Sequence, residues 1–231
     1  MNRVVADLKT LFTETNNPSV VKRIEELYQT WGSDDSKCVT SIWTCSTLLT
    51  GVINSTLVVD AVESYKGYDK KDFSHHFAVF KKTGLSKEFI ISNSMKFIRL
   101  LNSCIVDEGT FYNTEDRVTY RGVPEATISK QEVGQTFRVA NWLCTTEDQS
   151  VAEKFKKTGG TIIEFNIKKG CLNAGRINKF GISEYPGEAE TLIPPYTVVK
   201  IVSKEYNGKY VTLDVAKDNK YHDFKMAITS S

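Results

Sequence analysis

Two acidic residues separated by a single residue are the first feature of this sequence that could do chemistry. Glu188 and Glu190 follow a Pro-Gly turn, with Tyr185 at its tip, and come directly before an apolar run. Side chains two positions apart point to the same face of an extended segment, so we expect both carboxylates to face one place. The alternative is a Glu-x-Glu pair on the solvent-exposed face of a strand, which is the commoner occurrence of this pattern.

An Arg-Gly pair closes another strand-like run. Arg121 and Gly122 lie near the end of the segment Val118–Val123. The planar guanidinium of arginine can bind a phosphate through two hydrogen bonds, and a neighbouring glycine lets a ligand approach the backbone. The alternative is an ordinary surface arginine.

A cysteine and two threonines form the third candidate site. Cys144, Thr145 and Thr146 follow the strand-like residues Phe137–Leu143 and precede a predicted short helix. The two hydroxyls could bind a ligand or cap that helix, and the sequence leaves both open. A catalytic thiolate at Cys144 would need a neighbouring base. None of the three histidines stands in a recognisable Cys/His pattern, which argues against that role.

The overall composition excludes several classes of protein. Lys and Arg number 30 and Asp and Glu 28, and this net charge of +2 suggests neither a nucleic-acid binder nor an acidic tail. His75 and His76 are adjacent, about 100° apart on a helix, and would make a poor chelate, so we expect no metal. Neither the Rossmann glycine pattern nor the P-loop pattern occurs.

The cysteines and the first residues bear on the cellular compartment. The five cysteines are widely spaced and odd in number, which is typical of reduced thiols in a cytosolic protein. Asp7 and Lys9 interrupt any signal-peptide core. We therefore expect a cytoplasmic location, or delivery as an effector by a route not visible in the sequence. The uncharged segment Cys38–Val59 could span a bilayer by length, but its many Ser, Thr and Asn residues favour buried, soluble structure over a membrane span.

The elements that must position these residues follow from hydrophobic periodicity. Apolar spacing predicts helices at Val4–Phe12, Pro18–Trp31, Tyr68–Gly84 and Lys87–Asn102. The segment Ser36–Tyr65 is ambiguous because many of its residues are β-branched, but its spacing still permits a helix, which we favour. Asn17 and Pro18 supply an N-cap and a proline at the first helical position of the second helix, and Gly32 ends it.

The second half of the sequence has the pattern of β structure. Predicted strands are Arg117–Gly122, Thr136–Leu143, Thr161–Ile167, Glu190–Ile193, Thr197–Tyr206 and Lys209–Ala216. A short helix is predicted at Ser150–Lys157, and Asn207-Gly208 indicates a two-residue hairpin turn. The order of the elements predicts an α+β fold in one domain, residues 1–231, with a mainly helical part (1–101) and a β-rich part (102–231).

Taken together and in this order, the three candidate sites resemble the Arg–Ser–Glu branch of the mono-ADP-ribosyltransferases. This branch includes actin-modifying bacterial toxins, arginine-modifying effectors and vertebrate ecto-transferases. The motifs are Tyr120-Arg121-Gly122-Val123, Trp142-Leu143-Cys144-Thr145-Thr146 and Glu188-Ala189-Glu190. Their flanks agree with the family at Gly134–Phe137, Val151–Phe155, Ser183–Pro186 and Leu192–Pro195. The resemblance covers roughly Phe97–Tyr206 and implies a split β-sandwich around an NAD cleft.

The resemblance also implies roles for the site residues, with NAD as substrate and no metal. Glu190 would stabilise the positive charge that develops on the ribose as nicotinamide leaves. Glu188 would hold and help deprotonate the acceptor, a protein arginine. Arg121 would bind the pyrophosphate, with Gly122 allowing its close approach. Cys144 would contact Glu190, and Tyr185 would contact the target protein. The residues that would contact NAD are Tyr120, Thr145, Thr146 and Phe155, the last of them beside the nicotinamide.

The sequence departs from the family in the middle motif, where Cys144 and Thr146 replace the first and last serines. Cysteine is a poorer hydrogen-bond partner than serine, and we expect this to affect the rate more than the type of reaction. Three alternatives remain beside arginine transfer. One is an NAD glycohydrolase, in which water takes the place of the acceptor, and another is a catalytically inactive NAD-binding module. The third is modification of a nucleobase or of another side chain, against which the sequence argues only through Glu188.

Overall fold

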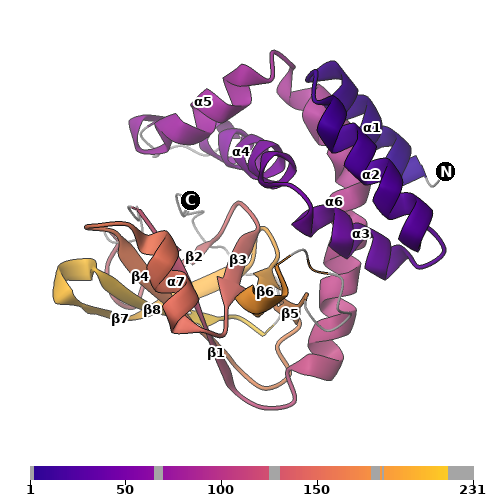
Figure 1. Ribbon diagram of the computed structural model, residues 1–231. Coiled ribbons are helices and arrows are strands. Elements are labelled where there is room, and N and C mark those ends of the chain that lie inside the picture. Colours follow the sequence, from indigo (N-terminus) through magenta and orange to yellow (C-terminus); the bar gives the residue numbers. More distant parts are fainter. Residues whose placement is uncertain (1–2, 65–69, 125–130, 178–182, 184, 218–231) are drawn as a thin grey trace. The chain divides into compact units, whose positions relative to one another are not determined.

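A computed structural model of the 231-residue chain describes residues 3–64, 70–124, 131–177, 183 and 185–217 (Figure 1). Its contacts divide the chain into two compact units. One comprises Met1–Cys104 and Lys179–Tyr185, and the other Ile105–Asn178 and Pro186–Ser231. Each unit is described by itself.

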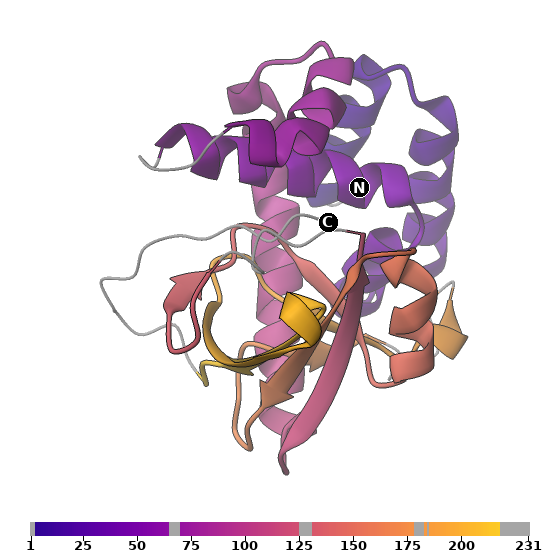
Figure 2. The same cartoon turned by 90° about the vertical axis from the view of Figure 1, so that its left-hand side faces the viewer.

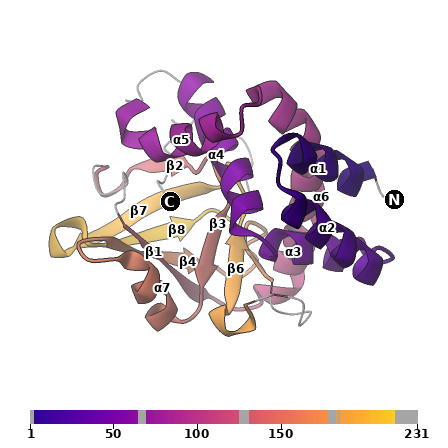
Figure 3. The same ribbon diagram turned by 45° about the horizontal axis from the view of Figure 1, so that its top comes forward.

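The first unit is helical. Its elements are α1 (Arg3–Glu14), α2 (Pro18–Trp31), α3 (Asp35–Thr44), α4 (Thr47–Ser64), the 3₁₀ helix η1 (Lys70–Phe73), α5 (Ser74–Lys82) and the first part of α6 (Lys87–Tyr112). Helices α1 and α2 lie side by side (Figure 3) because each buries one apolar stripe. The largest fully buried side chains of this unit are Phe12, Trp43 and Phe97, and the rings of Trp43 and Phe97 stack with centroids 6.4 Å apart.

Helix α2 begins at Pro18 and ends before Gly32, as the sequence predicted. The cap itself differs from the prediction. The Asn17 side chain makes no capping hydrogen bond and instead donates to the Thr15 carbonyl (2.7 Å) and hydroxyl (2.9 Å). An asparagine amide is both donor and acceptor, and the preceding turn here offers it acceptors.

Three predicted helices have clearly different bounds. The predicted helix Tyr68–Gly84 is the 3₁₀ helix η1 followed by α5, which ends at Lys82, and residues 68–69 lie outside the described part of the chain. The segment Ser36–Tyr65 is helical but broken at Cys45 and Ser46 into α3 and α4. Helix α6 continues ten residues beyond the predicted Asn102, because its buried positions recur through Leu101 and Ile105.

The uncharged segment Cys38–Val59 lies mostly buried within these helices. Several of its polar side chains find partners inside the unit: the Thr56 hydroxyl donates to the Val52 carbonyl (2.8 Å), and the Ser55 hydroxyl lies 3.1 Å from Nδ1 of His76. By length and composition alone, Lys87–Val106 could cross a membrane, as could α3 and α4 taken together with their 90° bend. The core helix of a soluble protein meets the same criteria.

The second unit contains one eight-stranded mixed sheet (Figure 2). Its strands are β1 (Arg117–Val123), β2 (Thr136–Arg138), β3 (Leu143–Thr146), β4 (Thr161–Ile167), β5 (Gly175–Arg176), β6 (Glu190–Ile193), β7 (Val198–Glu205) and β8 (Tyr210–Val215). Helix α7 (Gln149–Lys156) and the 3₁₀ helices η4 (Pro186–Glu188) and η5 (Tyr206–Gly208) complete it. The order is β2-β7-β8-β4-β1-β3-β6-β5, and only the β4–β8 pair is parallel among those described.

The sheet consists of two halves joined at one place. Strand β1 pairs with β4 over seven residues and β3 pairs with β6 over four, but β1 and β3 are joined only at Tyr120 and Thr146. Both halves contribute to one apolar core, which includes Phe165 and Leu213 from the first half and Leu143 and Ile193 from the second. This arrangement confirms the α+β prediction, with helices first and strands second.

Two β predictions need correction. The predicted strand Thr136–Leu143 is two short strands at distant positions in the sheet, because the chain leaves β2 at Val139 and enters β3 at Leu143. The β7–β8 hairpin is present, but its turn is the three-residue η5, in which Tyr206 and Asn207 have positive φ, and not a two-residue Asn-Gly turn.

Candidate active site

Arg121 lies where the two halves of the sheet meet. Its Nη1 donates a hydrogen bond to the Cys144 carbonyl (2.7 Å), across the point where β1 and β3 separate. Its Nε–H group is buried and has no hydrogen-bond partner among the residues that the structure describes. An unsatisfied buried donor is costly, and an anionic oxygen of a ligand would satisfy it. The residues present therefore fit the predicted pyrophosphate contact.

Glu190 begins β6, opposite Thr146 of β3. Burial raises the pKa of its carboxyl, and a hydrogen bond from the Cys144 thiol lowers it. The negative charge of Glu188 raises the pKa further, while the positive charge of Arg121 lowers it. The Glu190 carboxylate is thus influenced by one residue from each of the other two sequence motifs, Arg121 and Cys144, and by the other acid of its own motif, Glu188.

Glu188 approaches Glu190 by a route that the sequence did not predict. The two acids do not share an extended segment: Glu188 ends the 3₁₀ helix η4, Ala189 has a φ of 43°, and the strand starts only at Glu190. A non-glycine residue in this region of φ is unfavourable, so the bend at Ala189 is a strained connection. Burial raises the pKa of Glu188 as well.

The hydroxyls of the middle motif bond to the protein itself. Thr145 is buried and donates to the Thr191 carbonyl of β6 (2.8 Å), which ties β3 to β6. The Thr146 hydroxyl accepts from the Asp148 backbone N–H (3.0 Å), and the Asp148 carboxylate caps α7 by accepting from the Ser150 N–H (2.8 Å). The residue that caps α7 is therefore Asp148, and neither threonine hydroxyl caps the helix; Thr146 holds only the backbone of the capping residue. The contacts of both threonines with NAD stay predictions.

Gly122 has a packing reason for lacking a side chain. A Cβ built there would lie 1.8 Å from the Ala152 carbonyl oxygen and 2.7 Å from the Lys156 nitrogen. The backbone that approaches Gly122 closely is therefore that of helix α7. The predicted approach of a ligand at this residue is not needed to explain the glycine.

The three predicted aromatic contacts differ in exposure. Phe155 on α7 and Tyr185 before η4 are 55% and 52% exposed. Tyr120 is half-buried, and burial together with the negative charge of Glu164 raises its pKa. The first two are thus available to a ligand or partner, whereas Tyr120 is partly covered within the sheet unit.

Sequence reasoning missed two residues next to the acids. Glu147 follows the middle motif directly, and Arg176 stands on the two-residue strand β5. Their side chains form an ion pair, with Arg176 Nη2 2.5 Å from Glu147 Oε2. A strand of two residues leaves no periodic signal, so nothing in the sequence pointed to this pair.

Among the described residues, no group of three or more His, Cys, Asp and Glu side chains could hold a metal ion. His76 is a buried core histidine of the helical unit. Burial raises the pKa of the Cys38 and Cys171 thiols to about 11, so both are protonated at neutral pH. His222 lies outside the described residues.

Comparison with known proteins agrees with this arrangement of fold and motifs. The profile of the family described as NAD:arginine ADP-ribosyltransferase matches residues 42–223, which is most of the chain. The chain therefore belongs to this family of NAD-dependent ADP-ribosyltransferases. A search of curated proteins gave no significant match.

Solved structures show the same fold at low sequence identity. The ADP-ribosyltransferase Vis of Vibrio splendidus is 17% identical with a TM-score of 0.51, covering 92% of this chain and 93% of Vis. The eukaryotic mono-ADP-ribosyltransferase ART2.2 in complex with NAD is 16% identical with a TM-score of 0.55, covering 96% and 87%. Exoenzyme S of Pseudomonas aeruginosa bound to carba-NAD is 16% identical with a TM-score of 0.53, covering 94% of each chain.

Proposed function

We propose that this protein transfers ADP-ribose from NAD to the guanidinium group of a protein arginine and releases nicotinamide. Family membership establishes NAD-dependent ADP-ribose transfer as the class of reaction. ART2.2 and Exoenzyme S, whose structures hold NAD and carba-NAD, share the fold, which supports NAD as the substrate.

The observation that supports arginine as the acceptor is the carboxylate of Glu188. It is close enough to Glu190 to raise the pKa of that residue, and it has no ion pair with any residue described in the structure. A guanidinium has a pKa above about 12 and is a poor nucleophile while charged, so a neighbouring base is required. Because burial raises the pKa of Glu188, its carboxylate is a stronger base than an exposed glutamate.

In this proposal Glu190 acts on the ribose. Its carboxylate, held by the Cys144 thiol, lies where it stabilises positive charge that exists only as the bond to nicotinamide breaks. Arg121 binds the pyrophosphate through the donors that the Cys144 carbonyl does not use, including its buried Nε–H.

The transfer balances without a further reagent. The bond from ribose C1′ to the nicotinamide nitrogen breaks, and its electron pair leaves with nicotinamide as a neutral molecule. An arginine nitrogen forms the new bond to C1′, and its proton passes to Glu188 and then to water. No metal ion takes part in these steps.

The test uses NAD and agmatine, a small guanidino acceptor, and measures free nicotinamide and ADP-ribosylated agmatine separately. We expect the wild-type protein to form both. Glu188→Gln should lose agmatine product while keeping some nicotinamide release, because Glu190 and Arg121 remain. Glu132→Gln, which changes an exposed glutamate of the same unit, is the control and should behave as wild type.

The outcomes separate the competing functions. Nicotinamide release without any modified agmatine or protein would show a glycohydrolase. NAD binding without nicotinamide release would show an inactive NAD-binding module. Loss of both activities in parallel in Glu188→Gln would mean that Glu188 serves NAD binding and would contradict its role as the acceptor's base.

A further inference from the structure

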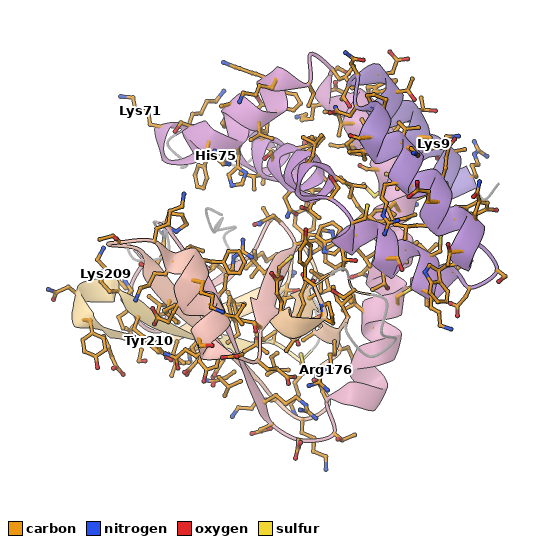
Figure 4. All side chains as sticks on the ribbon, viewed as in Figure 1. Lys9, Lys71, His75, Arg176, Lys209 and Tyr210 are labelled. Carbon is orange, nitrogen blue, oxygen red and sulfur yellow. The ribbon has the colours of Figure 1, made fainter. Side chains whose placement is uncertain are left out.

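The ion pair between Glu147 and Arg176 spans the strand that carries Glu190. Strand β6 lies between β3 and β5, and its residue Thr191 is paired with Thr145 on one side and with Arg176 on the other. Glu147 follows the end of β3, so the pair connects the two strands that flank β6. The Arg176 side chain is drawn and labelled in Figure 4. Two strand spacings amount to about 10 Å, a distance that only long side chains can bridge.

The backbones of the same two segments hold the chain on either side of Glu190. The Glu147 N–H donates to the Ala189 carbonyl (3.3 Å), and the Ile177 N–H donates to the Glu190 carbonyl (3.0 Å). Both carbonyls that bracket the start of β6 are thus bonded to residues at or next to the ion pair. Ala189, with its positive φ, is the strained residue that these bonds must hold in place.

The arginine side of the pair is itself fixed to the rest of the unit. Gly175, next to Arg176, packs so closely on α6 that a Cβ there would lie 3.1 Å from the Ile105 carbonyl oxygen. The Asn113 side chain, just after α6, donates to the carbonyls of Cys171 (2.7 Å) and Ala174 (2.9 Å). Strand β5 is therefore a fixed support from which Arg176 reaches across β6.

Glu147 depends on Arg176 for its charge compensation. Its Oε2 bonds to Arg176, while its Oε1 is buried and has no hydrogen-bond partner among the described residues. Without Arg176 this carboxylate would be poorly solvated, and it would move toward water and take the end of β3 with it.

We propose that the Glu147–Arg176 ion pair is a positioning device that fixes the backbone of Ala189 and Glu190, and through it the carboxylate of Glu190. Neither residue of the pair touches NAD in this proposal, which rests on the role of Glu190 under the proposed function. The pair is partly exposed, with side-chain exposures of 24% and 37%, so it adds little to global stability. A small misplacement of a catalytic group, by contrast, lowers the rate strongly.

The kinetic test compares Glu147→Gln, Arg176→Gln and the double variant with the wild type, measuring nicotinamide release. We expect each single change to lower kcat about tenfold, with KM for NAD changed less than about twofold, because positioning affects the transition state. The double variant should be no worse than the poorer single one, since the two residues act as a unit. Glu115→Gln is the matched control, because it breaks another Glu–Arg pair of the same unit, with Arg117 (3.3 Å).

Amide hydrogen exchange tests the same proposal without relying on activity. In Arg176→Gln the Glu147 amide should exchange about tenfold faster, and in Glu147→Gln the Ile177 amide should do so. The Ile162 amide, which donates to the Lys209 carbonyl (3.0 Å) in the other half of the sheet, should be unchanged.

The two measurements keep the proposals apart. Wild-type kcat in both single variants, or unchanged exchange at both amides, would overturn the positioning role. Kinetic losses that add in the double variant would also contradict it. If the wild-type protein does not cleave NAD, the proposed function fails, and the exchange experiment alone decides whether the pair holds Ala189 and Glu190.

Discussion

Replacing Gly122 by alanine tests how helix α7 and strand β1 depend on each other. The new Cβ would lie 1.8 Å from the Ala152 carbonyl oxygen, whereas a close C···O contact is about 3.3 Å. The helix would therefore have to withdraw by about 1.5 Å. Because the second contact, with the Lys156 nitrogen at 2.7 Å, is also with backbone, no side chain can rotate away to relieve it.

The structure gives the size of the effect. Overpacking of this kind costs about 1–3 kcal/mol, which lowers the melting temperature of a unit of this size by about 5–10 °C. The withdrawal also moves β1 relative to α7, and thereby disturbs Arg121 and Phe155 together. Because misplacing a binding group by about 1 Å can cost up to about a hundredfold, we expect kcat/KM for NAD to fall at least about tenfold.

The assay combines thermal denaturation with steady-state nicotinamide release. Gly51→Ala is the matched control, because a Cβ at this position of α4 meets nothing within 4 Å. That change should stabilise the protein by about 0.5–1 kcal/mol through helix propensity and leave NAD cleavage unchanged. A wild-type melting temperature and kcat/KM in Gly122→Ala would refute the reasoning, as would an equal loss of stability in both variants.

Three further predictions concern the acids and their supports. Because burial raises the pKa of Glu190 above 4.5, the ordinary value of a glutamate, its contribution to stability is present below that pH and is lost as pH rises through the folded-state pKa. Thermal melts should therefore show Glu190→Gln equal to wild type near pH 4 and more stable at pH 7; lower stability at pH 7 would contradict the burial argument. Ala189→Gly, which relieves a φ of 43°, should stabilise by up to about 1 kcal/mol in denaturant titrations, whereas Ala189→Val should destabilise. Cys144→Ser should retain or raise kcat. Cys144→Ala loses the hydrogen bond that lowers the pKa of Glu190, so it should move the acidic limb of the pH–rate profile to higher pH. Complete loss of activity in Cys144→Ser would instead indicate a catalytic thiolate.

The sequence predicted best those elements whose formation depends on their own residues. Strands Thr161–Ile167 and Glu190–Ile193 have the predicted bounds, because their apolar runs end at turn residues. The second helix begins at Pro18 for the same local reason. Local patterns thus sufficed for the strand that begins with Glu190.

The errors occurred where a distant part of the chain decides the local structure. Phe137 and Leu143 look like parts of one strand because no glycine or proline separates them, but β2 pairs with β7 at one edge of the sheet and β3 with β6 near the other. Glu188 and Glu190 look like neighbours on one strand, but the positive φ of Ala189 separates a 3₁₀ turn from β6. The pairing of Arg176 with Glu147 depends on a two-residue strand that no periodicity reveals.

The central claim is that the Glu190 carboxylate promotes the cleavage of NAD, while Arg121 and its neighbours bind NAD. One measurement tests this claim most directly. Nicotinamide release at saturating NAD should be measured for wild type and Glu190→Gln, with NAD binding to the same two proteins measured by calorimetry. We expect Glu190→Gln to bind NAD about as tightly as wild type and to release nicotinamide at least about a thousandfold more slowly. Full activity in Glu190→Gln would contradict the account, as would a loss of activity explained entirely by lost binding.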